Sequence, residues 1–262
     1  MAKPSGHAAH VPAAKRYVRM LDRVTPPVAA LLDESLLNEA AAELGLMIEG
    51  RFLGGGPNEL ASIIDFAMHE LRRDGPTVIE RSLDAKPPLP GSPDDLVLRG
   101  MVGSRFSVFL ADGIDATIGM HLYDMLGGPP RFLYDASFGQ RAFLGQRFAG
   151  RVLTIGEISL PIGIFLPLDQ VAANDILDEL LDSFPDREID DLHDLPPDDR
   201  ADVTAIIMVA ALEATLWLAE ELLREGETDP RFDPADGDRR SEPVALALPV
   251  RKPPKGNPKK KT

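Results

Sequence analysis

The sequence predicts an α+β fold: a helical N-terminal layer, a small, strongly bent antiparallel sheet or barrel of five strands, and C-terminal helices. Two observations predict it. Side chains in residues 103–168 alternate between apolar and polar with a period near two, which indicates strands. Residues 11–85 and 169–223 instead repeat apolar side chains at helical spacing, which is typical of amphipathic helices.

Five short runs in the central segment are rich in β-branched and aromatic residues. The runs are residues 106–110, 116–125, 131–134, 142–155 and 158–166, and Gly, Pro and Asp turns separate them at 112–113, 127–130, 137–139 and 156–157. Turn residues at such intervals favour tight connections between neighbouring strands. We therefore expect residues 93–168 to form an antiparallel β meander.

The N-terminal part divides at its prolines and glycines. Residues 1–24 are predicted to be a partly disordered basic N-terminus, disordered over 1–10, and a first helix that Thr25-Pro26-Pro27 stops at Val24. Residues 25–92 are predicted to be a helical region with a Pro-rich connector, and the helices are expected at 27–44, 57–73 and 77–85. Residues 46–53 fit either a helix end or a short strand. The four prolines of residues 86–93 mark the best candidate boundary.

Residues 169–226 are predicted to be C-terminal helices, at 169–184 and 198–223, joined by an acidic loop. Residues 227–262 have few apolar side chains and are predicted to be a disordered tail with a basic end. We expect the helices and the sheet to share one core, because a small sheet needs cover from neighbouring helices.

The last predicted helix resembles a membrane span in its apolar content. Residues 203–219 carry one charge, Glu213, near the middle, and both flanks are acidic. A central carboxylate is costly in hydrocarbon, and no basic flank anchors the segment. We expect no membrane span but a buried helix packed on the sheet, with Trp217 filling core volume.

Charge and cysteine content exclude several classes of function. The net charge is −14, although the last twelve residues hold six basic groups and no acid. An acidic body repels polyanions, so nucleic acid is an unlikely partner except through the basic tail. The chain has no cysteine, which excludes disulfides, thiolate zinc sites, iron–sulfur clusters and thiol nucleophiles, and favours a cytoplasmic location.

Two helix-associated motifs are weak candidates for chemistry. His69-Glu70 lacks the second histidine of a zinc-protease motif, because position 73 is Arg, so we expect a polar pair that faces solvent. Gly54-Gly55-Gly56 before Pro57 resembles an anion-binding turn. No Lys-Ser or Lys-Thr pair follows it, and Glu59 places a carboxylate where a phosphate would sit, so a plain loop is expected.

The remaining candidates are acids, serines and one histidine. The acidic cluster comprises His193 with Asp186, Glu188, Asp190, Asp191, Asp194, Asp198, Asp199 and Asp202. It lacks the spacing of a calcium loop, so a solvated loop is expected. Ser104 and Ser107 lack the flanking glycines of a nucleophile elbow, and His121 is expected to be a partly buried strand residue rather than a base. We therefore predict no catalytic, cofactor-binding or metal-ligating residue and no cofactor.

Two segments of the chain resemble known proteins. They are residues 66–83, FAMHELRRDGPTVIERSL, and the sheet from RFSVFLADGIDATIGMHLYDMLGGPPRFLYD to Leu160-Pro161. Both resemble a group of bacterial proteins that often end in a SEC-C zinc-binding tail. That tail binds zinc through cysteines among glycines and lysines. Here the corresponding residues 255–261 keep the basic character without any cysteine, so the resemblance implies neither the metal nor an activity.

Three hypotheses for function follow. The first is a soluble, non-enzymatic protein-interaction module with an unknown protein partner. The second is a hydrolase-type enzyme with a carboxylate-lined pocket. The third is contact of the basic tail with nucleic acid or the ribosome, which would depend steeply on salt.

Overall fold

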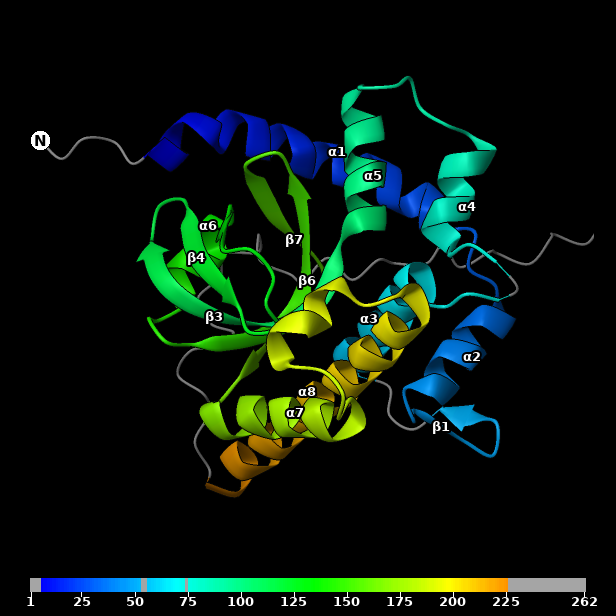
Figure 1. Ribbon diagram of the computed structural model, residues 1–262, viewed down its shortest axis with the longest axis vertical. Coiled ribbons are helices and arrows are strands. Elements are labelled where there is room, and N and C mark those ends of the chain that lie inside the picture. Colours follow the sequence, from blue (N-terminus) through cyan, green and yellow to red (C-terminus); the bar gives the residue numbers. More distant parts are fainter. Residues whose placement is uncertain (1–5, 53–55, 74, 226–262) are drawn as a thin grey trace, which may run out of the picture.

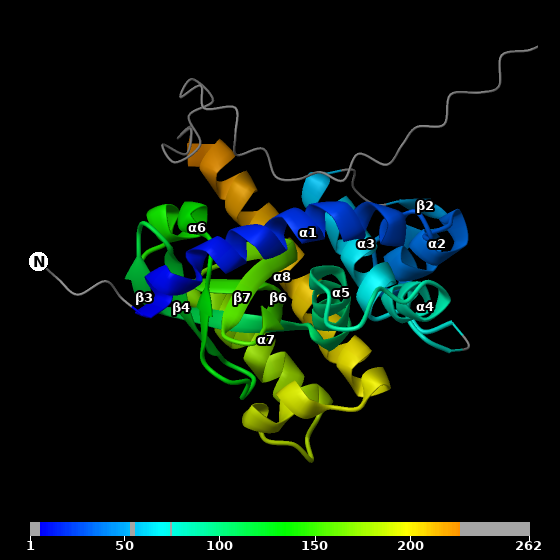
Figure 2. The same cartoon turned by 90° about the horizontal axis from the view of Figure 1, so that it is seen from above.

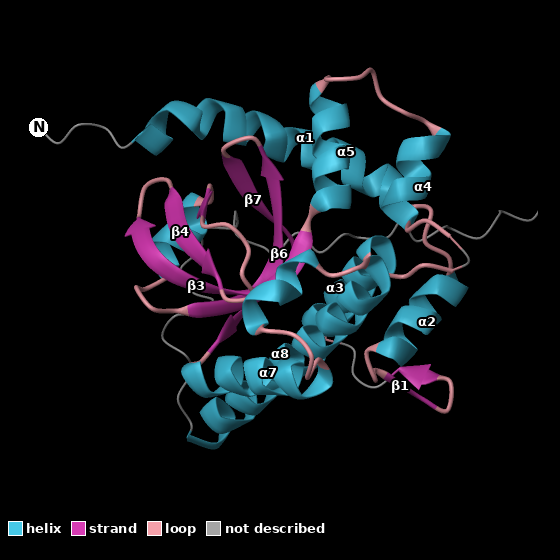
Figure 3. Cartoon of the chain, in the orientation of Figure 1, coloured by secondary structure: helices cyan, strands magenta, loops and turns pink. Residues whose placement is uncertain are grey.

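The computed structural model describes residues 6–52, 56–73 and 75–225, and five of its strands form a closed barrel that packs against helices (Figures 1 and 3). The N-terminal elements are η1 (Gly6–His10), α1 (Val11–Ala29), α2 (Glu34–Glu43), the hairpin β1 (Met47–Ile48) and β2 (Arg51–Phe52), α3 (Pro57–His69), α4 (Val78–Ala85) and α5 (Pro93–Gly103). The barrel strands are β3 (Arg105–Asp115), β4 (Gly119–Asp124), β5 (Arg131–Leu133), β6 (Arg147–Ile155) and β7 (Ile158–Leu168), with α6 (Ala136–Arg141) after β5. The chain continues through α7 (Gln170–Ser183), η2 (Ile189–Asp194) and α8 (Pro197–Glu225). The α+β class, the five-stranded barrel and the helices on both sides of it in the sequence are as predicted.

The barrel is mixed rather than wholly antiparallel. Its strand order is β3-β4-β5-β7-β6, and β6 returns to pair with β3. After β5 the chain passes through α6 and enters β6 beside β3, so β7 fills the remaining gap. There Leu133 pairs with Ser159 in parallel. The prediction of a simple antiparallel meander is therefore wrong at this one junction.

The first helix runs further than the sequence predicts. It passes through Pro26 and Pro27 to Ala29, and the carbonyl of Pro26 still accepts from the amide of Ala30 at 3.0 Å. A proline has no backbone N–H, so each of these two prolines removes one hydrogen bond from the last turns of the helix. Burial of Val28 and Ala29 offsets this loss. The next helix starts only at Glu34, where the Asp33 side chain accepts from the amide of Leu36.

Other differences from the prediction lie at element ends. Gly6–His10 forms a 3-10 helix instead of a disordered end, and the His7 ring stacks on Phe132 at 3.9 Å. Pro93–Gly103 is helical and is capped by Ser92, so the strands begin at Arg105. A helix occupies Ala136–Arg141 where a turn was expected, and β6 starts at Arg147 rather than at residue 142. The open choice at residues 46–53 is resolved as the β1–β2 hairpin.

Helices and barrel share a core, as expected. One buried cluster joins Ala40 of α2, Phe66 of α3, Val108 of β3, Ile176 of α7 and Ile207 of α8. In the view from above, α1 crosses over the barrel and α8 passes beneath it (Figure 2). A separate cluster fills the barrel itself, from residues Phe109, Ala111, Met120, Leu122, Leu133, Phe148 and Val152.

No helix in the described ranges combines the length and the apolar character that crossing a membrane requires. Instead, α8 packs against α3, α7 and β7, and Glu213 lies on its exposed side. The side chain of Trp217 and the predicted disordered tail, 227–262, lie outside the described residues.

Candidate functional site

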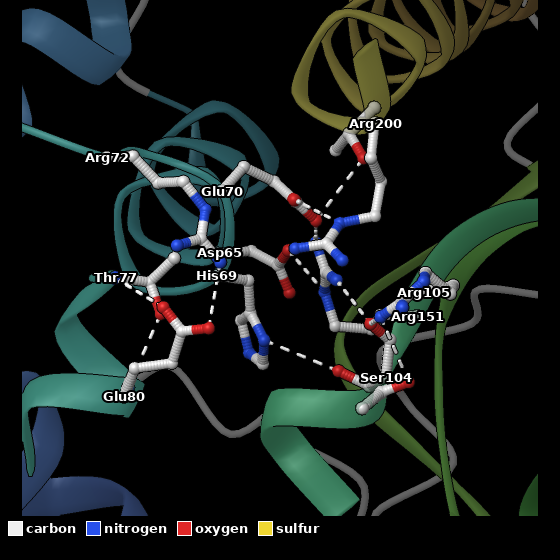
Figure 4. A network of polar contacts seen from close by, with 12 residues as sticks. Asp65, His69, Glu70, Arg72, Thr77, Glu80, Ser104, Arg105, Arg151 and Arg200 are labelled. Carbon is white, nitrogen blue, oxygen red and sulfur yellow. Dashed lines mark hydrogen bonds and ion pairs between the residues drawn. The ribbon is translucent and has the colours of Figure 1, made fainter. Parts of the chain in front are cut away.

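A buried cluster of charges joins α3, β6 and α8 (Figure 4). Arg151 of β6 donates from Nε to Oδ1 of Asp65 at 2.9 Å and from Nη2 to Oε1 of Glu70 at 2.8 Å. The side chain of Arg151 is 0% exposed, and both carboxylates are 1% exposed. One guanidinium thus holds two carboxylates from α3 and its C-terminal cap.

The second carboxylate oxygen of Glu70 extends the cluster to α8. Arg200 donates to it from Nε at 3.1 Å, and the Thr204 hydroxyl donates to Oε1 at 3.3 Å. His69 lies beside Ser104, with 3.4 Å between Nδ1 and Oγ. Burial, and then the positive charge of Arg151, hold the pKa of His69 well below its usual range, so its ring is neutral.

Asp65 is the least satisfied member of this cluster. Its Oδ2 is buried without a hydrogen-bond partner in the described part of the chain. Burial raises the pKa of Asp65 to about 6, against the opposing effect of Arg151. Gly163, in a bulge of β7 with φ of +63°, leaves the space in which this oxygen lies, because a Cβ there would overlap it.

The expectation of a solvent-facing His69-Glu70 pair is therefore wrong. His69 is 8% exposed and Glu70 is 2% exposed, because β7 and α8 cover this end of α3 and two arginines compensate the carboxylate. A substrate has no route to groups this deeply buried. The cluster connects α3 and α8 to the barrel, so a binding site must lie elsewhere, at the surface.

One end of the barrel interior is polar. Side chains two positions apart on a strand share a face, so Ser107, Asp124, Arg131 and Thr154 face inward like Phe109, Leu122, Leu133 and Val152 of the barrel core. Ser159 is the register partner of both Leu133 and Thr154 and completes this layer. The opposite end is filled by aromatic rings, with Phe138 of α6 against Phe148 and Phe165.

Asp124 is the buried acid of the polar layer. It is 1% exposed, and its Oδ1 accepts from the Ser107 hydroxyl and from the amide of Leu126. Its Oδ2 lies 3.3 Å from Nδ1 of His193 in η2. Gly128 makes this approach possible, because a Cβ there would overlap both side chains.

Above the polar layer runs an open groove made of two adjoining hollows. The first, about 320 Å³, is lined by α5 and the end of β6, including Leu96 and Arg99. The second, about 550 Å³, is lined by η1, β5 and the β6–β7 turn, including His10 and Tyr134. Arg131, Thr154 and Gly156 line both hollows, so they form the floor where the two meet. We call this feature the barrel-end groove.

Arg131 is the charged residue at the centre of the groove. Among the described residues it has no carboxylate within ion-pairing distance and its guanidinium makes no hydrogen bond. Burial lowers the pKa of Arg131, and the charge of Asp124 acts in the opposite direction. At the rim, Arg99 pairs through Nε with Asp95 at 2.8 Å, and its side chain is 60% exposed.

Histidines and aromatic rings close the far end of the groove. His7 lies 3.3 Å from the Tyr134 hydroxyl, and His10 pairs with Glu157 at 3.2 Å. His121 is exposed on β4 instead of partly buried, because the strand turns it outward, where its ring meets the edge of Phe132 at 4.9 Å. Burial lowers the pKa of His7, as do the neighbouring His121 and His10.

The other sequence candidates are dispersed. Ser104 and Ser107 are both buried and bonded within the fold. Within the described ranges no three His, Asp or Glu side chains gather to hold a metal ion, and His193 of the acidic cluster faces Asp124 instead. Gly54 and Gly55 lie outside the described residues, and Gly56 caps α3. The sequence motifs did not point to Arg131 or Arg151 as candidate site residues.

The fold and the groove define an α+β protein with a helix-covered, closed barrel that is polar at one end. Residues 25–191 match a family described as "Family of unknown function (DUF7986)", and the chain belongs to this family. The matched range includes Asp65, Arg131 and Arg151, whereas η1 and α8 lie outside it. Comparison with curated proteins gave no match, and neither did comparison with solved structures.

Proposed function

We propose that this protein is a non-enzymatic interaction module that receives a segment of a partner protein in the barrel-end groove. One observation supports this most: the groove is open, yet its aliphatic hydroxyls are not activated for nucleophilic chemistry. The Thr154 hydroxyl lies 3.0 Å from that of Ser159, and His10 is paired with Glu157. Neither hydroxyl has a histidine or carboxylate beside it to act as a base.

The hydrolase alternative has less support. Glu157 is the one carboxylate that lines the two hollows of the described chain, so a carboxylate-lined pocket is not what they offer. General acid–base catalysis by carboxylates requires at least one more such group within reach of a bound substrate. The buried acids Asp65 and Glu70 are closed off from both hollows.

A blocking substitution tests the interaction role. Thr154 is exposed on the floor of the groove, so Thr154→Tyr fills the junction of the hollows without entering the core. We expect a partner captured from the native cell extract by the wild-type chain to be lost with T154Y. A matched Glu179→Tyr variant on the exposed side of α7 should retain it. Equal capture by T154Y and wild type would contradict the proposal.

A chain that ends at residue 225 tests the tail hypothesis in the same experiment. If the basic tail carries the contact, this truncation loses the partner and the wild-type interaction weakens steeply with salt. If the groove carries it, the truncated chain retains the partner.

We further propose a bacterial source, a cytoplasmic location and kinship with the proteins that often end in a SEC-C tail. Support for these comes from the sequence resemblance over residues 66–83 and the barrel, and from the absence of cysteine. Detection of the native protein in a cytoplasmic fraction would test the location.

A further inference from the structure

If the groove binds a partner protein, as proposed above, the charges and side chains that line it indicate which kind of segment it binds. Arg131 is the first residue of β5 and belongs to the inward-facing layer, two positions from Leu133. In this position Arg131 is half-buried, it lines both hollows, and among the described residues it has no ion-pair partner. A half-buried guanidinium without an ion-pair partner has donors that suit a carboxylate or a phosphate.

Asp124 does not fully satisfy Arg131. Its Oδ1 is already occupied by Ser107 and by the amide of Leu126, and its Oδ2 faces His193. Oδ2 has no hydrogen-bond partner in the described chain, so Arg131 is not bonded to it either. The charge of Asp124 raises the pKa of Arg131, while the guanidinium remains available to a ligand in the groove.

The charges of the groove differ in sign from those of the whole protein. The chain carries a net charge of −14. Two arginines, Arg99 and Arg131, line the groove against one carboxylate, Glu157, and the lowered pKa of His7 leaves that ring neutral at pH 7. Two guanidinium groups against one carboxylate attract a short acidic segment locally, whereas the acidic rest of the protein repels a long polyanion.

The lining of the groove suits a chain that carries both acidic and apolar side chains. Apolar side chains line it beside the basic ones: Leu96, Val152 and Ile155 in one hollow, and Pro129, Pro130 and Phe132 in the other. An extended peptide turns successive side chains in opposite directions. Acidic side chains would then face Arg131 and Arg99 while apolar ones contact the walls.

We propose that the barrel-end groove binds an extended acidic segment of the partner protein, with a carboxylate of that segment held by the guanidinium of Arg131. The rim residue Arg99 contacts a second acidic side chain through the donors that Asp95 leaves free. This assigns to Arg131 a binding role that explains why a charged residue occupies the inner layer of a small barrel.

Fluorescence anisotropy tests this with a fluorescein-labelled octapeptide of alternating Glu and Val. An octapeptide of alternating Gln and Val is the uncharged control. We expect the Glu-Val peptide to bind and the Gln-Val peptide to bind at least about tenfold more weakly, because charge-assisted hydrogen bonds are lost. R131Q should weaken the Glu-Val peptide by a similar factor, whereas R187Q, at an exposed site outside the groove, should not change its affinity.

A charge-reversal pair at Thr154 keeps the test decisive if R131Q does not fold. T154E and T154K change the same exposed position with opposite charges. We expect T154E to abolish binding of the Glu-Val peptide and T154K to strengthen it. Equal affinities of the two variants, or of the Glu-Val and Gln-Val peptides, would overturn the inference. Inorganic phosphate and an eight-nucleotide oligo-dT serve as competitors for the labelled Glu-Val peptide. If either displaces it at concentrations where unlabelled Glu-Val peptide does not, the inference is overturned as well.

The inference and the proposed function can fail separately. If Gln-Val and Glu-Val peptides bind equally and T154Y removes both, the groove is an interaction site but the acidic class is wrong. If neither peptide binds while the native partner is still captured by T154Y, the groove itself is the wrong site.

Discussion

Arg151 of β6 contacts Asp65 of α3 through 2.9 Å between Nε and Oδ1, across 86 positions of sequence, and both side chains are buried. Glu70 shares the same guanidinium. Two acids around one buried base give a cluster whose members depend on one another, because each charge is compensated only by its neighbours. The attachment of α3 to the barrel therefore includes a strong polar component.

Replacing Arg151 with Met should be severely destabilising. The substitution keeps an unbranched apolar stem but removes the guanidinium, so Asp65 and Glu70 stay buried with one counter-ion fewer, which costs about 3–5 kcal/mol. Urea denaturation followed by circular dichroism measures the loss. The control Arg187→Met, at an exposed position, should change the free energy of unfolding by less than about 0.5 kcal/mol. A loss below 1 kcal/mol for R151M would show that the cluster does not hold the fold together.

Asp65 gives the cluster a pH dependence of known sign. Burial raises its pKa from 3.8 to about 6, so between these values the folded protein holds a proton that the unfolded chain has released. Stability therefore falls as pH rises through this window. Relative to D65N, the wild-type protein should lose about 2 kcal/mol of stability between pH 4 and pH 7.

Urea titrations of both proteins at several pH values would measure this difference. Asp84→Asn, on the exposed side of α4, controls for general effects of charge removal. A difference between wild type and D65N that stays flat or grows with pH would contradict the assignment.

Gly163 and Gly156 form a matched pair of glycines with positive φ, +63° and +59°. A Cβ at Gly156 meets nothing within 4 Å, whereas one at Gly163 would overlap Oδ2 of Asp65. G156A should therefore cost only the backbone strain, about 1–2 kcal/mol. G163A adds the displacement of Asp65 and should cost at least about 2 kcal/mol more. Chemical denaturation compares them, and equal losses would refute the close packing of β7 on Asp65.

The proline connector should not separate two independent units. A protease site inserted after Leu89, which is 78% exposed, allows the chain to be cut there after folding. Because Asp65 contacts Arg151 and Phe66 shares a buried cluster with Val108 of the barrel, across the cut, the pieces should co-elute and melt in one transition. A residue 90–262 piece that separates and melts cooperatively alone would show two domains.

Much of the fold follows from local sequence patterns. The alternation in residues 103–168 and the turn residues between strands predict five strands, and helical periodicity predicts the helices on either side. These local patterns do not show which strands pair with one another. Whether β6 or β7 lies beside β5 depends on the path through α6, and Pro26-Pro27 reads as a stop although tertiary burial of Val28 and Ala29 extends the helix.

The buried charges left a signal in the sequence. Arg151 stands within the apolar strand sequence Ala149-Gly-Arg-Val-Leu153, and Asp65 stands within Ile63-Ile-Asp-Phe66. A charge at a core position of a strand and an opposite charge at a core position of a helix predict each other, because neither can be buried alone. Arg131 had no such signal, since its place in the groove depends on the barrel closing and on α5 and η1 lying beside it.

Site-specific photo-crosslinking tests the central claim most directly. Glu157, whose side chain is 83% exposed at the edge of the groove, can carry a benzoylphenylalanine, with Glu179 on α7 as the matched position away from it. The account predicts that irradiation in the native cell extract joins the position 157 variant to a defined protein through an acidic segment, and that adding R131Q to this variant removes the product. Products of equal yield from positions 157 and 179, or a product at position 157 that R131Q leaves unchanged, would contradict it.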